Sequence, residues 1–256
     1  MASAEDTIDL SDRGGTLQIS RWGDGAPSIV MLHDGLGSVA QWRDVPAAIG
    51  ARTGRGVLAY DRAGHGRSTP VPSGPWPYRW HVDEAHVLER IMQHFDMPER
   101  IVVGHSDGGT IAFEHALLGY EQDCLVAVAS HTFLEEISLA TCRALVAHPE
   151  PVIAGLARAH AEPGALLRAW SEGWLAEHMA DYDIRSELGR IEHPVLVAQG
   201  ERDEYATDGQ AITTAAAIGS NAELLIEPGA KHLWHHDDPS RFVDVVVDFV
   251  ARTVDG

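Results

Sequence analysis

The chain of 256 residues is 45% hydrophobic and 22% charged, which are values of an ordinary globular protein and exclude a disordered or fibrous class. Its formal net charge of −19 makes nucleic acid or an anionic membrane surface an unfavourable partner. Two cysteines are too few for a disulfide scaffold or a multi-cysteine zinc site. The N-terminal residues contain no apolar stretch and no segment reaches the length of a membrane span, so we expect a cytoplasmic protein. We expect it to be a monomer or a homodimer.

Short apolar segments with β-branched residues alternate with amphipathic segments along the chain. This alternation is typical of an α/β fold with a largely parallel sheet. A more polar stretch over 7–21, interrupted by Gly14 and Gly15, predicts a hairpin at the sheet edge. Strands buried on both faces are predicted over 28–33, 56–61, 100–104, 124–130, 194–200 and 222–227.

Helical periodicity fills most of the intervals between these strands. Apolar residues spaced three and four apart predict helices over 85–95 and 242–250, and a Pro-rich stretch over 69–77 predicts a surface loop. The segment 138–190 has no strand candidate and is punctuated by Pro and Gly. We therefore predict an α/β core made of residues 1–137 and 191–256, with 138–190 inserted as a helical cap.

A candidate nucleophile lies in the run from Gly104 to Gly108, which reads Gly-His-Ser-Asp-Gly. The Gly-x-Ser-x-Gly pattern alone is common, but here it directly follows a predicted strand and precedes a helix-like segment. A sharp strand-to-helix turn needs small residues and lifts the hydroxyl of Ser106 above the sheet. The same turn directs the backbone N–H of Asp107 toward a substrate oxyanion. A tight turn with an incidental serine is the alternative.

Several motifs distributed over the chain resemble those of the α/β-hydrolase fold superfamily. They are residues 32–38 after one strand, residues 61–68 after the next, the serine turn, and the acidic and histidine segments near the C-terminus. The resemblance implies a mostly parallel, twisted sheet flanked by helices, with an inserted helical cap and no cofactor. A serine at the turn argues against the haloalkane dehalogenases and epoxide hydrolases of this fold, which use an aspartate there.

The loop from His33 to Gly37 matches the superfamily's oxyanion loop, and by this resemblance Gly35 supplies the second oxyanion N–H. Asp34 departs from the pattern, because many relatives carry glycine at that position. A carboxylate there either contacts the substrate or bonds to its own loop. His33 is expected to bridge loops below the site.

The catalytic base needs a carboxylate to orient it, and in this fold the acid follows a late strand. Asp203 matches the superfamily spacing after the strand that ends at residue 200 and is preferred over Glu201 and Glu204. Glu135 and Glu136 are the reserve candidates, because a rarer arrangement places the acid after an earlier strand.

The histidine is expected on the loop between the last strand and the last helix, where His232 lies. His235 and His236 are close by, and we expect them to be solvated or to support the site. The same histidines with Asp237 and Asp238 also resemble a metal cluster. No zinc-hydrolase motif occurs, however, and Pro239 opposes a regular helix across the cluster, so we predict no metal.

Apolar side chains of the predicted cap share one helical face, which either lines a substrate pocket or packs the cap onto the core. Residues near the serine turn and at the entry to the cap are further candidates. The expected substrate contacts are Asp34, Leu36, Phe133, Leu134, Trp170 and Trp174.

These features favour a hydrolase that cleaves a carboxylic ester or lactone of a small, partly apolar molecule through an acyl-enzyme. Ser106 is the expected nucleophile, His232 the base and Asp203 the orienting acid. A carbon–carbon bond hydrolase acting on a β-diketone or ring-cleavage product would use the same residues. A non-catalytic small-molecule binding protein on this fold is the alternative of another class.

Overall fold

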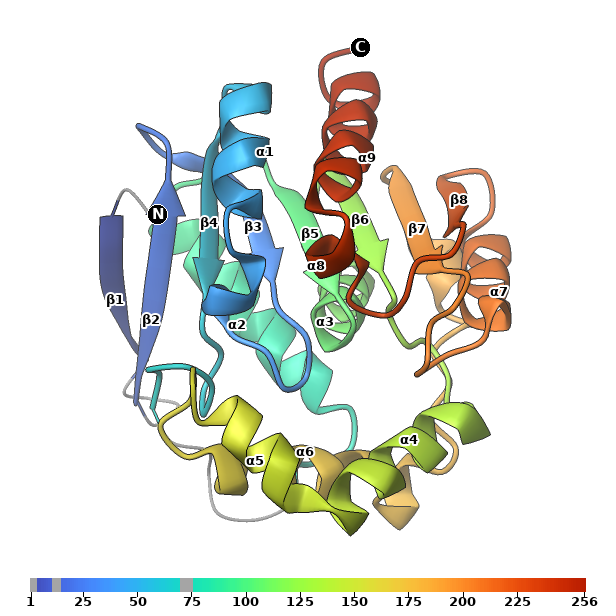
Figure 1. Cartoon of the computed structure of the whole chain (residues 1–256). Coiled ribbons are helices and arrows are strands. Elements are labelled where there is room, and N and C mark those ends of the chain that lie inside the picture. Colours follow the sequence, from blue (N-terminus) through green and yellow to red (C-terminus); the bar gives the residue numbers. More distant parts are fainter. Residues whose placement is uncertain (1–3, 11–14, 70–75) are drawn as a thin grey trace.

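The computed structural model describes residues 4–10, 15–69 and 76–256 and forms one eight-stranded sheet flanked by helices (Figure 1). The strand order is β1-β2-β4-β3-β5-β6-β7-β8. The pairs β1–β2 and β2–β4 are antiparallel, and the remaining pairs are parallel. The strands are β1 (Ala4–Leu10), β2 (Gly15–Trp22), β3 (Pro27–Leu32), β4 (Gly56–Tyr60), β5 (Ile101–His105), β6 (Cys124–Val128), β7 (Val195–Gly200) and β8 (Ala222–Glu227).

Helices cover both faces of this sheet. The helices of the core are α1 (Val45–Thr53), α2 (Trp80–His94), α3 (Asp107–Leu117), α7 (Asp208–Ile218), α8 (Trp234–Asp237) and α9 (Pro239–Thr253), with a 3₁₀ turn η2 (Val39–Trp42). One apolar core joins the sheet to α1 and α9, and the other joins it to α2, α3 and α7. In β5, Ile101 and Val103 face the first core and Val102 faces the second, as a strand buried on both faces requires. The predicted α/β class is confirmed.

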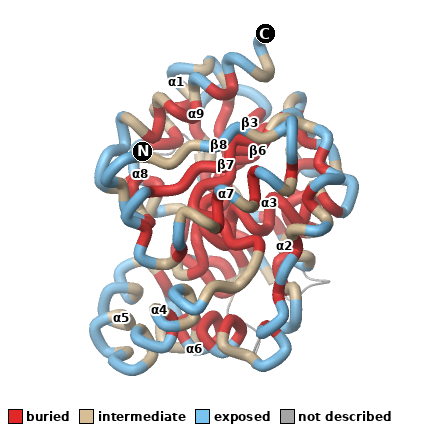
Figure 2. The backbone as a smooth tube through the Cα atoms, turned by 90° about the vertical axis from the view of Figure 1, so that its right-hand side faces the viewer, coloured by how far each residue is buried: buried red, intermediate tan, exposed pale blue. Residues whose placement is uncertain are grey.

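The predicted strands occur in the structure, but one expectation about burial is wrong. Among the described strands β8 pairs with β7 alone and lies at the sheet edge, and its residues are partly exposed or exposed (Figure 2). The apolar composition of β8 led to the expectation that both of its faces are buried. At the sheet edge a strand has fewer packing neighbours, so an apolar composition does not ensure burial there. The predicted N-terminal hairpin is confirmed as β1 and β2, whereas Gly14 and residues 70–75 of the predicted Pro-rich loop lie outside the described residues.

The loops that carry the candidate site residues after β3 and β5 meet where the strand order changes direction. From β3 the chain crosses to β4 on one side, and from β4 it continues to β5 on the other side of β3. The carboxyl ends of β3 and β5 therefore lie together without a crossover helix between them. In open α/β sheets such a switch point is where ligands bind. Here the residues that follow it are Asp34 and Gly35 after β3, and Ser106 after β5.

Residues 136–190, between β6 and β7, form what we call the helical segment. It contains α4 (Glu136–Ala147), α5 (Pro149–Leu156), α6 (Pro163–Trp174) and the short 3₁₀ turns η3 (Glu177–Met179) and η4 (Leu188–Arg190). Figure 1 shows α4, α5 and α6 crossing below the carboxyl ends of the parallel strands. The segment is thus placed over the switch point of the sheet.

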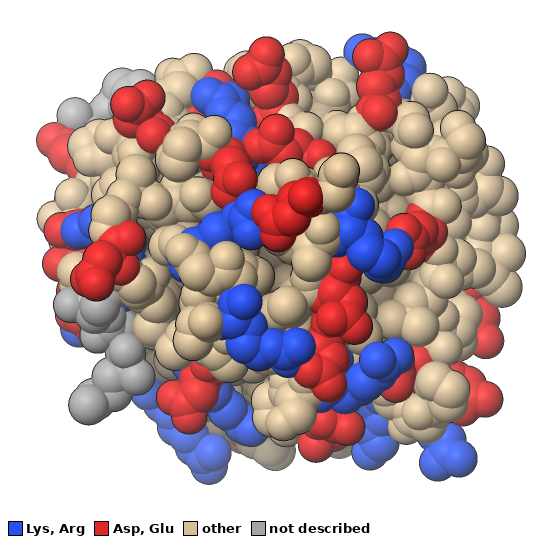
Figure 3. Space-filling view, turned by 90° about the horizontal axis from the view of Figure 1, so that it is seen from above, with Lys and Arg blue, Asp and Glu red and all other residues tan. Residues whose placement is uncertain are grey.

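Charged side chains of both signs are intermingled on the face opposite the helical segment (Figure 3). Across the described ranges, no helix has the length and apolar character needed to span a bilayer.

The core between the sheet and α9 should dominate stability on that face. Phe249 of α9 is 1% exposed, so Phe249→Ala is expected to lower the free energy of unfolding by about 3–5 kcal/mol through lost burial and a residual cavity. Asp248→Ala changes an exposed neighbour on the same helix and should alter stability by less than about 0.5 kcal/mol. Urea unfolding of both variants measures the difference, and equal stabilities would contradict this view of the core.

Candidate active site

Ser106 occupies a strained turn between β5 and α3. Its backbone φ of 53° is unusual for a residue other than glycine, and its N–H donates to the carbonyl of Val128 at 2.8 Å. The glycine at 104 is required by close approach, because a Cβ there would lie 2.5 Å from the carbonyl oxygen of Gly108. The turn thus matches the predicted geometry, with the serine side chain at the carboxyl end of the sheet.

A cavity of about 160 Å³ opens at this turn. Ser106 and His232 both line it, together with residues that follow β3 and with side chains of α4 and α6. The sheet therefore supplies the polar floor of the cavity, and the helical segment supplies much of its apolar wall.

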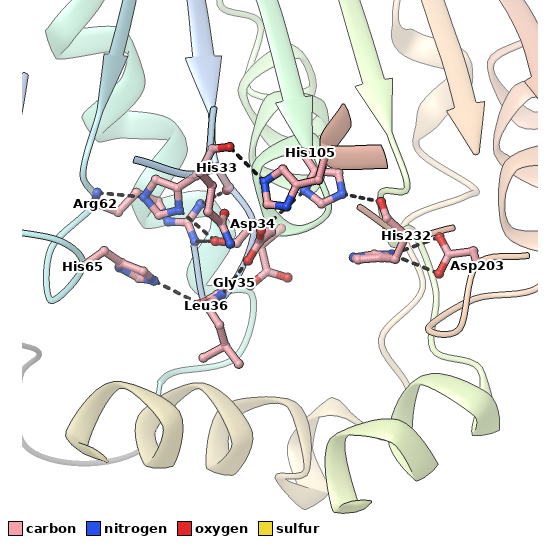
Figure 4. Close-up of polar contacts among 12 residues, drawn as sticks. His33, Asp34, Gly35, Leu36, Arg62, His65, His105, Asp203 and His232 are labelled. Atoms are coloured by element: carbon pink, nitrogen blue, oxygen red, sulfur yellow. Dashed lines mark hydrogen bonds and ion pairs between the residues drawn. The ribbon is translucent and has the colours of Figure 1, made fainter. Parts of the chain in front are cut away.

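His232 and Asp203 form a close hydrogen-bonded pair (Figure 4). The Nδ1 atom of His232 lies 3.0 Å from Oδ1 and 2.9 Å from Oδ2 of Asp203. Because an ionised carboxylate only accepts hydrogen bonds, Nδ1 carries the proton and donates it. The other ring nitrogen, Nε2, is then left with a lone pair that can accept a proton when the imidazole is neutral.

The environment adjusts the pKa values of this pair in opposite directions. Burial alone would lower the pKa of His232, but the charge of Asp203 and its hydrogen bond outweigh burial and raise it above the ordinary value. Burial alone would raise the pKa of Asp203, and the nearby His232 and the N–H of Tyr205 lower it below its usual range instead. The carboxylate therefore stays ionised and stabilises a positive charge on the imidazole.

The competing carboxylates have other partners. Glu201 accepts from the backbone N–H of Gly229, and Glu204 accepts from the backbone N–H of His232 rather than from its ring. The reserve candidate Glu135 is bonded to Thr207 and Gln210, whereas Glu136 pairs with Arg143. Among the carboxylates that sequence reasoning considered, Asp203 is the one that contacts the imidazole.

Two backbone N–H groups are available beside Ser106. Within the described part of the chain, neither Gly35 N nor Asp107 N is bonded to an acceptor, and both residues line the cavity. The carbonyl of the peptide that carries Gly35 N is held from behind by Arg62 Nη2 and by His33 Nδ1, each at 2.8 Å. Since N–H and C=O of one peptide point in opposite directions, these bonds direct Gly35 N away from Arg62.

Asp34 bonds to its own loop and also lines the cavity. Its Oδ1 accepts from Leu36 N at 2.9 Å, while its Oδ2 lies 3.6 Å from His105 Nδ1. Burial would raise the pKa of this carboxyl, but His105 and the other nearby histidines lower it well below the ordinary value. Asp34 therefore bonds to its own loop, and its place in the cavity wall is also compatible with contact to a substrate.

The predicted substrate contacts divide into two groups. Leu36, Leu134, Trp170 and Trp174 line the cavity beside Asp34. Phe133 is not among the residues that line it, because its ring packs against the guanidinium of Arg185 at 3.9 Å instead.

Other residues of the cavity wall were missed by sequence reasoning. His131 follows β6, Cys142 belongs to α4, and the ring of Tyr205 lies 4.5 Å from that of His232. Tyr205 is two residues beyond Asp203, which is a local signal that could have suggested it. No local pattern marks Cys142, since its position depends on how α4 docks.

The histidines near the C-terminus have different surroundings from one another. The described residues contain no group of three or more His, Cys, Asp or Glu side chains that could hold a metal ion. His235 is buried against Trp42, with ring centroids 4.9 Å apart, and also lies beside His105 at 4.7 Å; of the two alternatives expected for it, exposure to solvent is wrong and a supporting position beside the site fits. The cause is that α8 packs its ring into the core beside α9. His236 is partly exposed and contacts the carbonyl of Gln41.

The comparison with known families agrees with the observed fold. A sequence model of the alpha/beta hydrolase family matches residues 29–245, which is most of the chain. The protein therefore belongs to the alpha/beta hydrolase family and is a hydrolase of that fold.

Relatives of the chain have different named activities. A non-heme haloperoxidase of Rhodococcus erythropolis is 25% identical, over 82% of this chain and 87% of its own length. A bifunctional esterase/perhydrolase of Acinetobacter calcoaceticus is 26% identical, over the same shares of the two chains. The crystal structure of a hydrolase from Pseudomonas aeruginosa PA01 superposes with a TM-score of 0.74 at 23% identity, over 98% of this chain and 99% of that one. That likeness shows the shared fold.

The pairing of His232 with Asp203 predicts a measurable titration. Asp203→Asn removes the negative charge that raises the pKa of His232, so the pKa of this ring should fall, since burial then acts without compensation. NMR titration of the histidine ring signals measures the change. Glu201→Gln is the matched control, because its carboxylate bonds to a backbone N–H at residue 229. An unchanged His232 pKa in Asp203→Asn would contradict the assigned pairing.

Proposed function

We propose that this protein is a serine hydrolase that cleaves a carboxylic ester or lactone of a small, partly apolar substrate through an acyl-enzyme. The observation that carries the proposal is the pair of His232 and Asp203 in the same cavity as the strained Ser106. In this proposal the helical segment acts as a cap that lines the acyl site.

The proposed reaction follows from the roles of these groups. Ser106 Oγ attacks the carbonyl carbon while His232 Nε2 accepts its proton, and Asp203 stabilises the resulting imidazolium. The N–H groups of Gly35 and Asp107 stabilise the tetrahedral oxyanion. As the C–O bond breaks, His232 returns the proton to the leaving alkoxide. Water then attacks the acyl-enzyme by the same route, which releases the acid and restores the serine.

The size and lining of the cavity support a small, partly apolar substrate. Its volume of about 160 Å³ is close to the roughly 150 Å³ of an apolar protein cavity that can hold one benzene molecule. Leucines 36, 134, 139, 156 and 233 supply apolar surface around the polar floor. The acyl group is the part of the substrate that would be enclosed there.

The carbon–carbon alternative has less support from this cavity where its substrate is a ring-cleavage product. A ring-cleavage product carries a carboxylate, and recognition of a carboxylate generally uses Arg or Lys. Neither residue type occurs among the described residues that line the cavity. A purely binding role has less support as well, since it would not require the buried His232–Asp203 pair.

A fluorophosphonate probe tests the nucleophile directly. The wild type should be labelled, and Ser106→Ala should lose labelling and hydrolysis of 4-nitrophenyl butyrate by at least about 10³-fold, because the attacking oxygen is gone. Ser138→Ala is the matched control, since this second serine also lines the cavity. Labelling that persists in Ser106→Ala, or is lost in Ser138→Ala instead, would contradict the proposal.

A further inference from the structure

Asp107 is a buried carboxylic acid beside the nucleophile. It is the first residue of α3 and follows Ser106 directly, it lines the cavity, and it is only 2% exposed. The proposed oxyanion chemistry uses only its backbone N–H. A buried carboxylate is costly to keep ionised unless partners compensate for the lost water, so its surroundings indicate what it can bind.

The side chains that hydrogen-bond to this carboxyl group are neutral. The indole N–H of Trp170 donates to Oδ2 at 3.2 Å, and the indole of Trp174 also interacts favourably with the carboxylate. Among the described residues, no Lys, Arg or His forms an ion pair with it. Arg62 is the nearby cation, but its Nη atoms donate to the carbonyls of His33 and Asp34, and Arg62 does not line the cavity.

The titratable and charged groups around Asp107 come from several elements. Burial raises its pKa to about 6, Arg62 after β4 opposes that rise, and Asp34 after β3 adds to it. The charge of Asp107 in turn helps to raise the pKa values of Cys142 in α4 and of Tyr182 after η3. At neutral pH the carboxyl group is therefore largely ionised, and the cation that partly offsets its charge, Arg62, is not among the described residues that line the cavity.

The walls of the same cavity are aromatic. Trp170 and Trp174 of α6 line it together with Tyr205, and Asp34 adds a second carboxylate. Aromatic faces attract cations through the ring quadrupole, and carboxylates attract them by charge. A cavity lined by both, with no Lys or Arg among its described lining residues, favours a positively charged ligand and disfavours an anionic one.

We infer that Asp107, with the aromatic rings of Trp170, Trp174 and Tyr205, forms a cation subsite that selects esters carrying an ammonium group and rejects esters carrying an anion. This inference rests on the proposed function, since it names the class of ester that Ser106 attacks. Asp107 is then a specificity-determining residue through its side chain, in addition to its backbone role.

Three esters with the same leaving group test the selectivity. They are the 4-nitrophenyl esters of butyrate, of 4-(trimethylammonio)butyrate and of 4-sulfobutyrate, which differ in the charge at the end of the acyl chain. In the wild type, kcat/KM should be highest for the cationic ester and lowest for the anionic ester. Asp107→Asn keeps an oxygen that accepts from Trp170, and it should lower the ratio of cationic to neutral kcat/KM roughly tenfold.

The pH dependence of that ratio isolates the side chain. Deprotonation of His232 affects the neutral and cationic esters alike, so it cancels, whereas ionisation of Asp107 favours only the cationic ester. The ratio should rise as the pH increases through about 6 in the wild type and stay flat in Asp107→Asn. Asp181→Asn, which removes an exposed carboxylate of the helical segment, should keep the wild-type profile.

Binding without turnover separates this inference from the proposed function. In Ser106→Ala, calorimetry should detect butyltrimethylammonium binding in preference to butanesulfonate, and adding Asp107→Asn should weaken the cation roughly tenfold. Equal binding of the two ions, or cation binding unaffected by Asp107→Asn in a variant with wild-type thermal stability, would overturn the cation subsite. Ester hydrolysis that survives Ser106→Ala would overturn the proposed function instead.

Discussion

The chemistry of the cavity depends on the hydrogen-bonded contact between Asp203 and His232. With both carboxylate oxygens about 3 Å from Nδ1, the proton of the neutral imidazole is held on the nitrogen that faces Asp203. The orientation of the ring is further fixed by its backbone, since the carbonyl of His232 accepts from His105 Nε2 at 2.9 Å. A base that is pre-oriented in this way needs no rearrangement when it takes up a proton.

The sheet topology explains why these groups meet although they are far apart in sequence. Asp203 follows β7, His232 follows β8, and Ser106 follows β5, so the carboxyl ends of three parallel strands contribute one residue each. Gly35 joins them because β3 lies next to β5 at the switch point. The helical segment completes the cavity from the other side with indole, thiol and leucine side chains.

The predictable parts of this molecule are those with strong local signals. The strands, the turn at Ser106 and the final helix follow from apolar runs, glycine spacing and helical periodicity, and the sheet class was correct. The burial of β8 was misjudged because strand order decides which strand lies at an edge, and composition does not record strand order. For His235 the sequence left open whether it is solvated or supports the site, and the short helix α8, which buries its ring, decides against solvation.

The contacts of the helical segment were the hardest to predict. Trp170 and Trp174 were candidates because of their helical spacing, but the approach of Trp170 to Asp107 depends on how α6 docks on the core. Phe133 was expected in the cavity and instead contacts Arg185. These outcomes depend on long-range packing between elements, which residue spacing within one element does not specify.

The central claim is that Ser106 becomes covalently acylated during turnover, and rapid-quench mass spectrometry of the reaction with 4-nitrophenyl butyrate tests it most directly. The account predicts a burst of nitrophenol release that coincides with a butyryl mass on the peptide containing Ser106, and decay of that mass as butyrate appears. Turnover at full rate with no acylated peptide would contradict it, because hydrolysis would then proceed by direct attack of water.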